Sequence, residues 1–591
     1  MDRTAQLVAH RAESAIAYDP AVLAGPLHSG AARVLEENWT GTSTVPSRSL
    51  YPHQWSWDSA FVAIGLRHIS ALRAQTELET LLAAQWADGR IPHIVFNPAV
   101  PLDAYFPSPD FWRSSTAGRA AGAPRGVETS GIVQPPVHAL AAWLVHLADP
   151  GLSRARGFLA GLYPRLAAWH RYLLHRRDLG GGGLACVVHP WEQGMDNAPS
   201  WDAPLARITP APSRSFRRAD LDHGAAEDRP TDLDYGRYVR LAADYRDRGY
   251  RDGPDEAHGD GPAGPGHGGG PTGFAVEDPA FNALLIASEH ALARIAHELG
   301  ATGTARHARA ERLTAALIDR LWDPAAGMFL CRDLRAAPAP AGRGGPGRSR
   351  LPGPAHDGGP GHDGGQGHDG GPGHDGGPAY GGPRRTDLPG PGHEPEPGHG
   401  PEPGHGRIRP HGAGADRSGP GGARHGEGPA RATGRPVPRG GLLPERGVSG
   451  LIPLILPTLP RETAATLVRT LTGPHFGLGA ATRLAPSYDL LGDAFDPHRY
   501  WRGPAWFNTN WLLERGLRTH GERERADALR EALLRTAGTS GFAEYVDPRT
   551  GEACGAAGFG WTAALTLDLL HTATTGAGNK WGRKHKGGDR T

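Results

Sequence analysis

A block of low-complexity sequence, residues 336–440, sets the strongest limit on how this chain can fold. Gly, Pro and His dominate the block, and all 15 Trp residues of the chain lie outside it. A segment of this composition cannot bury enough apolar surface to offset the entropy lost on ordering. The sequence therefore predicts a disordered insertion between two parts of one catalytic domain, residues 1–335 and 441–575, with a basic disordered tail at 576–591.

The histidines of this block repeat at a fixed spacing. His356, His362, His368 and His374 lie six residues apart, and a second series begins at His393. Clustered imidazoles favour loose binding of divalent metal ions, so a metal-storage protein is one hypothesis. We favour a repeat expansion in a surface loop, because added loop length costs little entropy. The sequence predicts no metal site and no cofactor, because it has neither GxGxxG after a strand nor an HExxH helix.

Charge and cysteine content exclude several classes of partner. Lys and Arg number 63 against 62 Asp and Glu, so no basic field is available for nucleic acid or an anionic membrane surface. The three cysteines share no CxxC spacing and are expected to be reduced thiols. No apolar run approaches the ~18 residues of a membrane span, and the N-terminus lacks a signal-peptide core. We expect a cytoplasmic protein whose partner is a small molecule, and the sequence leaves a homo-oligomer open.

Helical periodicity recurs on both sides of the block. Apolar residues follow helical spacing in nine stretches: 74–86, 131–148, 157–177, 281–300, 307–322, 462–471, 506–521, 523–538 and 561–573. No alternating strand pattern of similar length competes with them. The long connections are rich in Trp, Tyr, His, Asp and Pro, and connections commonly carry binding residues. The sequence predicts an all-α toroid or bundle with its chemistry on the loops.

The motif YPHQWSWDSAF, residues 51–61, combines aromatic rings with a carboxylate. Aromatic faces cover the apolar side of a pyranose while a carboxylate accepts hydrogen bonds from its hydroxyls. Trp55, Trp57 and Asp58 therefore suit the floor of a carbohydrate site. An aromatic core cluster with Asp58 as a helix cap is an equally good explanation of this motif alone.

The motif HPWEQGMDNAPSWD, residues 189–202, places Asp196 in a Gly- and Pro-rich loop. Such a loop projects side chains into a site, although an Asx turn explains Asp196 as well.

The motif GFAEYVDPRTGEACG, residues 541–555, places Glu544 between two aromatic residues, a setting that can perturb a carboxyl pKa. Asp547 and Glu552 are rival carboxylates in the same loop. Two carboxyl groups from distant motifs, surrounded by tryptophans, are what hydrolysis of a glycosidic bond needs: one protonates the leaving oxygen, and the other activates water or attacks the sugar. Sequence spacing leaves the stereochemistry open.

These motifs also match a known family in order. YPHQWSWDSAF, GRIPHIVFNP, TSGIVQPP, HPWEQGMDN, PTDLDYGRY, SYDLLGDAFDPHRYWRGPAWFNTNW and GFAEYVDPRTGEACG resemble glycoside hydrolase family 63, most closely its mannosylglycerate and glucosylglycerate hydrolases. Trehalases and processing glucosidases are more distant relatives. The resemblance implies an (α/α)6 barrel and an inverting mechanism.

The resemblance also implies roles for individual residues. Asp196 matches the general acid and Glu544 the general base. Tyr51, Trp57, Asp58 and Gln134 fall on positions that resemble sugar contacts, and Trp191 and Glu192 flank the acid. Trp55 and Trp506 are further candidate substrate contacts. Residues that resemble the glycerate site are Arg229 and Tyr235, with Tyr500 and Trp501 beside them. Arg217 and Arg218 lie near Arg229 in sequence, so they are alternative carboxylate ligands.

The predicted function is hydrolysis of a small α-glycoside, glucosylglycerate or mannosylglycerate, to hexose and glycerate, with glucose favoured as the hexose. A trehalase-like or α-glucosidase activity on a neutral disaccharide is the enzymatic alternative. A catalytically silent sugar-binding barrel is the non-enzymatic alternative, and the presence of both Asp196 and Glu544 weighs against it.

Overall fold

The computed structural model describes residues 20–222, 226–252, 273–336 and 441–574. All of them belong to one compact unit. The predicted insertion, apart from residue 336, and the predicted tail lie outside the described residues.

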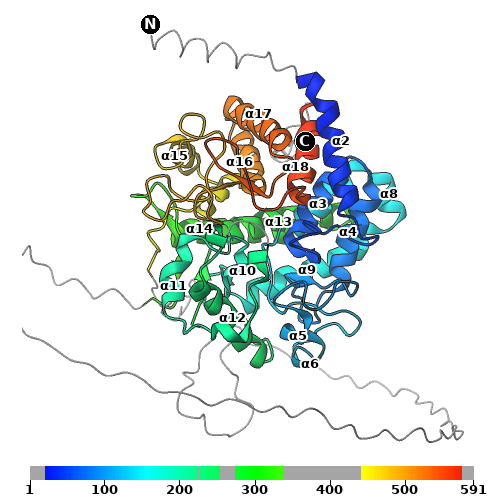
Figure 1. Cartoon of the computed structure of the whole chain (residues 1–591). Helices are drawn as coiled ribbons and strands as arrows, with labels where there is room; N and C mark the ends of the chain where they lie inside the picture. Colours follow the sequence, from blue (N-terminus) through cyan, green and yellow to red (C-terminus); the bar gives the residue numbers. More distant parts are fainter. Residues whose placement is uncertain (1–19, 223–225, 253–272, 337–440, 575–591) are drawn as a thin grey trace, which may run out of the picture. The chain divides into compact units, whose positions relative to one another are not determined.

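Helices dominate the described residues (Figure 1). The α-helices are α2 (Pro20–Glu37), α3 (Ser56–Leu66), α4 (Ala71–Ala83), α5 (Pro109–Trp112), α6 (Ser114–Ala117), α7 (His138–Ala148), α8 (Pro150–Ala155), α9 (Phe158–Arg176), α10 (Pro190–Gln193), α11 (Asp202–Ala206), α12 (Asp232–Asp247), α13 (Pro279–Glu298), α14 (Thr304–Leu321), α15 (Arg461–Thr472), α16 (Phe507–Thr519), α17 (Arg523–Thr539) and α18 (Gly560–Thr574). The 3-10 helices are η1 (Pro199–Trp201), η2 (Ser213–Ser215), η3 (Ala219–Asp222), η4 (Ala226–Asp228) and η5 (Val448–Ile455).

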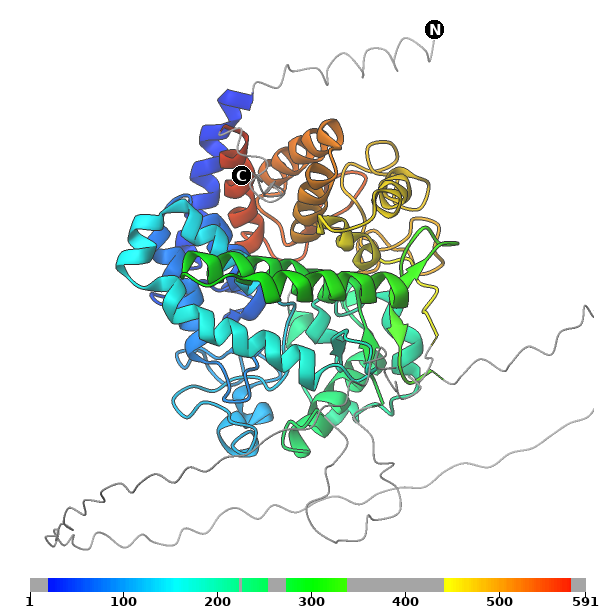
Figure 2. The ribbon, with the colours of Figure 1, turned by 180° about the vertical axis from the view of Figure 1, so that it is seen from behind.

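Several helices begin at a polar side chain that caps the first turn. The side chains of Ser70, Asp149, Thr231 and Asp278 each accept a hydrogen bond from a backbone N–H of the helix that follows. Helix α13 adds a proline at its first position and buries residues on all sides. It packs against α7, α9, α14 and η5, and the green helices of this part of the chain cross the middle of the view in Figure 2.

The packing partners of the inner elements close on themselves. Helix α3 packs against α7, α7 against α13, α13 against η5, η5 against α16, α16 against α18, and α18 against α3. The last contact brings the two ends of the described chain together, as the red and blue helices in Figure 1 show. A closed series of this kind is consistent with an α/α toroid.

Short paired strands connect the loops to one another. Each strand has two residues: β1 (Gln54–Trp55), β2 (Ile94–Val95), β3 (Cys186–Val187), β4 (Val276–Glu277), β5 (Trp322–Asp323), β6 (Met328–Phe329), β7 (Arg332–Asp333), β8 (Ala505–Trp506), β9 (Tyr545–Val546) and β10 (Ala553–Cys554). The pairs β1–β2, β3–β4, β4–β7, β5–β6, β8–β9 and β9–β10 are all antiparallel. Because β1 leads directly into α3 and β8 into α16, these pairings fix the loops at the helix N-termini.

The nine stretches predicted from periodicity correspond to α4, α7, α9, α13, α14, α15, α16, α17 and α18. The prediction for 131–148 is wrong over its first seven residues, because α7 begins at His138. Pro135 and Pro136 cannot donate backbone hydrogen bonds, and a residue before proline avoids the helical conformation. The residues before α7 form an extended loop, which leaves Gln134 free to enter the site described below.

The structure also bears on the cysteines and on two negative expectations. Cys186, Cys331 and Cys554 are free thiols, as predicted. Among the described residues, no helix combines the length and apolar character needed to cross a membrane. In the same part of the chain, no three His, Cys, Asp or Glu side chains are grouped so as to hold a metal ion.

Candidate active site

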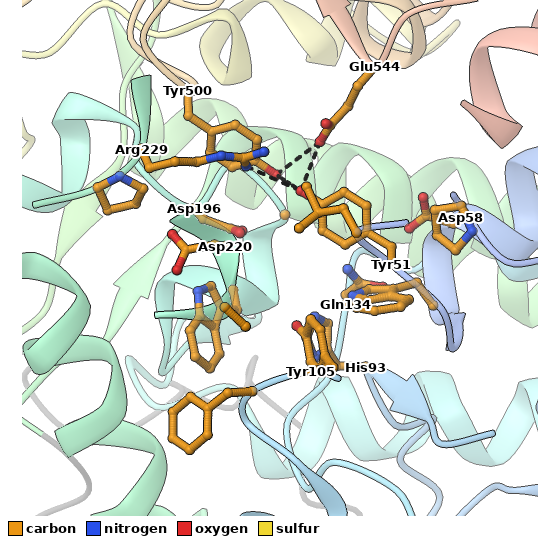
Figure 3. A pocket seen from close by; sticks show the side chains of 18 of the residues that line it. Tyr51, Asp58, His93, Tyr105, Gln134, Asp196, Asp220, Arg229, Tyr500 and Glu544 are labelled. Carbon is orange, nitrogen blue, oxygen red and sulfur yellow. Dashed lines mark hydrogen bonds between the residues drawn. The ribbon is translucent and has the colours of Figure 1, made fainter. Parts of the chain in front are cut away.

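An aromatic cavity lies where the loops meet (Figure 3). It encloses about 940 Å³ of non-protein space, including its open mouth. Aromatic walls with a few convergent polar groups are the lining expected of a small-molecule site. The predicted site residues that line it are Tyr51, Trp55, Trp57, Asp58, Gln134, Trp191, Asp196, Arg229, Tyr235, Tyr500 and Glu544.

Glu544 is fixed at both carboxylate oxygens. Its Oε1 accepts hydrogen bonds from the hydroxyls of Tyr51 at 3.0 Å and Tyr500 at 3.4 Å, and its Oε2 accepts from the Ala556 N–H at 3.0 Å. Burial raises the pKa of this carboxyl group, while Arg229 and the hydrogen bonds oppose the rise. A carboxylate held in one orientation by donors is suited to accept a proton from water.

Close packing explains the glycine that faces Glu544. Gly555 has a φ of +68°, and a Cβ there would lie 2.5 Å from Glu544 Oε2. Only glycine combines this backbone conformation with such an approach.

Asp196 occupies a different electrostatic environment. It follows α10 in the loop that Gly194 opens in the left-handed conformation, and its backbone oxygen accepts a hydrogen bond from the Tyr238 hydroxyl at 3.0 Å. Within the described residues its carboxyl group forms no ion pair. Burial, and then the charge of Glu544, raise the pKa of Asp196 to about 7, against the opposing effect of Arg229. A carboxylic acid that stays protonated near neutral pH can act as a general acid.

Arg229 is the one arginine or lysine among the described residues that line the cavity. Its guanidinium lies 4.9 Å from the centre of the Tyr500 ring, and its Nη1 donates to the Tyr51 hydroxyl at 3.4 Å. It is 6% exposed, so its charge is little screened by solvent. The two alternative arginines do not line the cavity and already have carboxylate partners: Arg217 pairs with Asp222, and Arg218 pairs with Asp220.

Tyr235 lines the cavity with its ring, but its hydroxyl is already engaged. The O–H donates to the backbone oxygen of Phe106 at 3.2 Å. In this geometry the hydroxyl hydrogen is not available to a carboxylate, so the predicted role of Tyr235 narrows to shaping the wall.

Asp58, Trp57 and Gln134 form another part of the wall. Gln134 Oε1 accepts the Trp57 N–H at 3.1 Å, which orients the side-chain amide at the start of α3. Burial, followed by the charges of Glu544 and Asp196, raises the pKa of Asp58. Gly194 packs against the Trp57 ring, since a Cβ there would lie 2.6 Å from it. The loop that carries Asp196 and the ring of Trp57 are therefore in direct contact.

Three residues predicted to bind the substrate lie outside the cavity lining. Glu192 is fully buried and is paired through both oxygens with Arg177 at 2.5 and 2.7 Å, so its role is to hold the loop. Trp501 and Trp506 stack on each other, with ring centres 3.8 Å apart and planes 1° from parallel. Both are buried behind Tyr500, whose ring meets that of Trp506 edge-on. We correct their predicted role from contact with the substrate to support of residues that face it.

The sequence prediction also missed residues that line the cavity: Pro46, Leu50, His93, Ala104, Tyr105, Phe106, Gly194, Ala219, Asp220, Pro230, Tyr238, Phe559 and Trp561. His93 Nδ1 and Trp561 Nε1 are buried without a hydrogen-bond partner in the described structure. Burial lowers the pKa of His93 to about 3, so this imidazole is neutral. The motif GRIPHIVFNP contains His93 and was the signal available for it, whereas Asp220 lies in no such motif.

The fold and the cavity together define a helical protein with three carboxyl groups of raised pKa, those of Asp58, Asp196 and Glu544, among aromatic walls. The family model described as "Mannosylglycerate hydrolase MGH1-like glycoside hydrolase domain" matches residues 51–350 and 429–562. The chain therefore belongs to this family of glycoside hydrolases.

Individual relatives agree with this assignment. A mannosylglycerate hydrolase from Rubrobacter radiotolerans is 35% identical over 93% of this chain and 98% of that protein. A glucosylglycerate hydrolase from Mycolicibacterium hassiacum is 31% identical over 94% of this chain and 99% of that protein. The crystal structure of a GH63 mannosylglycerate hydrolase from Thermus thermophilus, in complex with Tris and D-glycerate, matches with a TM-score of 0.65. The two chains are 29% identical, and the match covers 92% of this chain and 99% of the other.

Proposed function

We propose that this protein is an inverting glycoside hydrolase that cleaves glucosylglycerate or mannosylglycerate to hexose and glycerate. The observation that carries the proposal is the carboxyl pair in one aromatic cavity, with the pKa of Asp196 raised to about 7 and Glu544 held by two phenol hydroxyls. Relatives named for both hexoses align along nearly the whole chain, which supports the substrate class.

The chemistry divides between the two carboxyl groups. Asp196 gives its proton to the glycosidic oxygen as the bond to glycerate breaks. Glu544 takes a proton from the water that attacks the opposite face of the anomeric carbon, so the configuration inverts. Figure 3 shows the two side chains entering from different sides of the cavity. Arg229 is the residue with the charge and position to bind the glycerate carboxylate.

We further propose that the closed series of inner elements is the inner ring of an (α/α)6 barrel, with η5 as one member. The packing of α18 onto α3 supports closure of the ring. Residues 1–335 and 441–575 would then be two parts of one catalytic domain.

Glycerate release by the purified protein tests the function directly. Glucosylglycerate and mannosylglycerate are supplied separately, and we expect release from at least one of them. Asp196→Asn and Glu544→Gln are each expected to lower kcat by about 10²–10⁴-fold, the usual contribution of a general acid or base. Glu552→Gln is the matched control, because Glu552 lies in the same loop as Glu544 but is exposed and outside the cavity lining.

The neutral-disaccharide alternative is tested in the same assay. Hydrolysis of trehalose without release of glycerate from either glycoside would overturn the acidic substrate while keeping the carboxyl pair. The silent sugar-binding barrel would be favoured if the folded protein hydrolyses none of these substrates and if Asp196→Asn and Glu544→Gln bind sugar as the unmodified protein does. Inversion is checked by NMR, since the first anomer of the released hexose distinguishes inverting from retaining hydrolysis.

A further inference from the structure

Asp220 adds a second charged group to the cavity near the general acid. It lies in η3 and lines the cavity together with Arg229. Its position can be located through two neighbours, because the charges of Asp220 and Asp196 both raise the pKa of Tyr105 and of Tyr235. Figure 3 shows Asp220 beside Asp196 and Arg229, whereas Asp58 lies across the cavity.

This position corresponds to the aglycone side of the proposed reaction. A general acid protonates the oxygen of the leaving group, so the leaving group must lie next to Asp196. Asp220 and Arg229 are therefore the two charged groups that an aglycone meets. Their charges have opposite signs, so this end of the cavity favours one orientation of a bound aglycone.

A neighbouring arginine holds the Asp220 carboxylate in place. Arg218 donates to both of its oxygens, at 2.9 and 2.8 Å, and its guanidinium lies 4.4 Å from the centre of the Tyr235 ring. Arg218 also donates to the backbone oxygen of Pro230, the residue after Arg229. A carboxylate has about four acceptor sites, so two stay open after this fork forms. The anion is fixed, and it can still accept a hydrogen bond from a ligand.

We propose that Asp220 accepts a hydrogen bond from a free hydroxyl of the aglycone, so that the site selects a hydroxy acid. The aglycone carboxylate binds Arg229, and its hydroxyl points to Asp220, because the reverse orientation would bring two carboxylates together. Glycerate satisfies both groups, whereas an acid without the free hydroxyl satisfies only Arg229. This inference rests on the proposed function and deepens it.

Competitive inhibition by small acids tests the role of Asp220. D-glycerate and D-lactate differ only in the terminal hydroxyl, so the ratio of their inhibition constants reports recognition of that group. In the unmodified protein we expect D-glycerate to bind at least about tenfold more tightly than D-lactate, because a polar site left unpaired rejects the analogue. Asp220→Ala should bring the ratio to within about twofold, and Asp220→Asn, which keeps an acceptor, should retain part of it.

Two controls separate this role from others. Arg229→Gln should weaken both acids and leave their ratio unchanged, because both carry the carboxylate. Asp222→Ala alters a neighbouring carboxylate of η3 that pairs with Arg217 and does not line the cavity, so it should change nothing. An unchanged ratio in Asp220→Ala, or a ratio near one in the unmodified protein, would overturn the inference. If glycerate release persists in that case, the proposed function stands; if neither acid binds and no glycerate is released, the proposed function fails first.

Discussion

Glu192 lies in α10, Asp196 lies four residues further on in the loop that follows, and the two carboxyl groups have opposite environments. Glu192 is fully buried and bound by Arg177 through both oxygens, and it also accepts the Val188 N–H at 2.8 Å. Asp196 faces the cavity without an ion pair in the described structure, and its pKa is raised to about 7. The comparison shows that the partner, rather than the residue type or the motif, determines which carboxyl group supports the fold and which is available for chemistry.

The first way to break this contrast is to remove the partner of Glu192. Arg177→Met would leave the buried Glu192 carboxylate without its counter-charge and would also remove one of the two arginines that pair with Asp252, the other being Arg90. Loss of a buried counter-charge typically costs about 3–5 kcal/mol of unfolding free energy. Chemical denaturation measures the loss. The double variant Arg177→Met with Glu192→Gln removes the unpaired charge of Glu192, while Asp252 keeps Arg90, so it should be more stable than Arg177→Met alone. If the single variant loses less than about 1 kcal/mol, the pair is not what holds the loop.

The opposite result is expected for Asp196. Its folded-state pKa lies above the ordinary value of 3.8, so the stability it contributes as a neutral acid is lost as the pH rises through about 7. Asp196→Asn should therefore stabilise the protein at pH 8, by ~2 kcal/mol for a carboxyl group that faces an open cavity. The gain should shrink at pH 5 and disappear below pH 3.8.

Thermal or denaturant unfolding of both proteins at pH 8 and pH 5 checks this prediction. A gain that does not change with pH would show that the Asp196 charge is not costly in the folded protein. Since the same substitution should abolish hydrolysis, a stabilised but inactive variant would separate the role of Asp196 from that of Glu192.

This comparison also shows what the sequence could and could not predict. Helical periodicity identified nine helices, because each buries one apolar face regardless of its partners. Asp196 and Glu544, predicted from separate motifs, line the same cavity. The motifs failed for Glu192, because its partner Arg177 belongs to the end of the preceding helical stretch and the pairing exists only in three dimensions.

The other failures have the same origin. Trp501 and Trp506 lie in an aromatic motif typical of a sugar site, yet the faces of their rings stack on each other. Asp220 lies in no recognised motif, and Arg218, which donates to both of its oxygens, holds it at the cavity. Side-chain pairing, rather than composition or spacing, decides these positions.

A smaller effect on stability and activity is expected at the contact between the Asp196 loop and the Trp57 ring. Gly194 has a φ of +79°, and a Cβ there would meet the Trp57 ring at 2.6 Å. Gly194→Ala should cost about 1–2 kcal/mol for the left-handed conformation, plus a loss of kcat/KM as Trp57 or Asp196 is displaced. Gly300→Ala is the matched control, because Gly300 has a φ of +88° with open space around its Cβ position. It should show the conformational cost alone; an equal loss of kcat/KM in both variants would contradict the packing argument.

The smallest predicted effect concerns the pKa of Glu544 relative to that of Asp196. The Tyr51 hydroxyl donates to Glu544 Oε1 and so lowers a pKa that burial raises. Tyr51→Phe should raise the pKa of Glu544, because the charged form loses a donor. Glu544 must be ionised to act as a base, so the acidic limb of the kcat/KM profile should move to higher pH by less than about one unit. The alkaline limb follows ionisation of Asp196 near pH 7 and should move little, because Tyr51 donates to Glu544 and not to Asp196. A shift of the alkaline limb alone would mean that the acid and base roles of the two carboxyl groups are reversed.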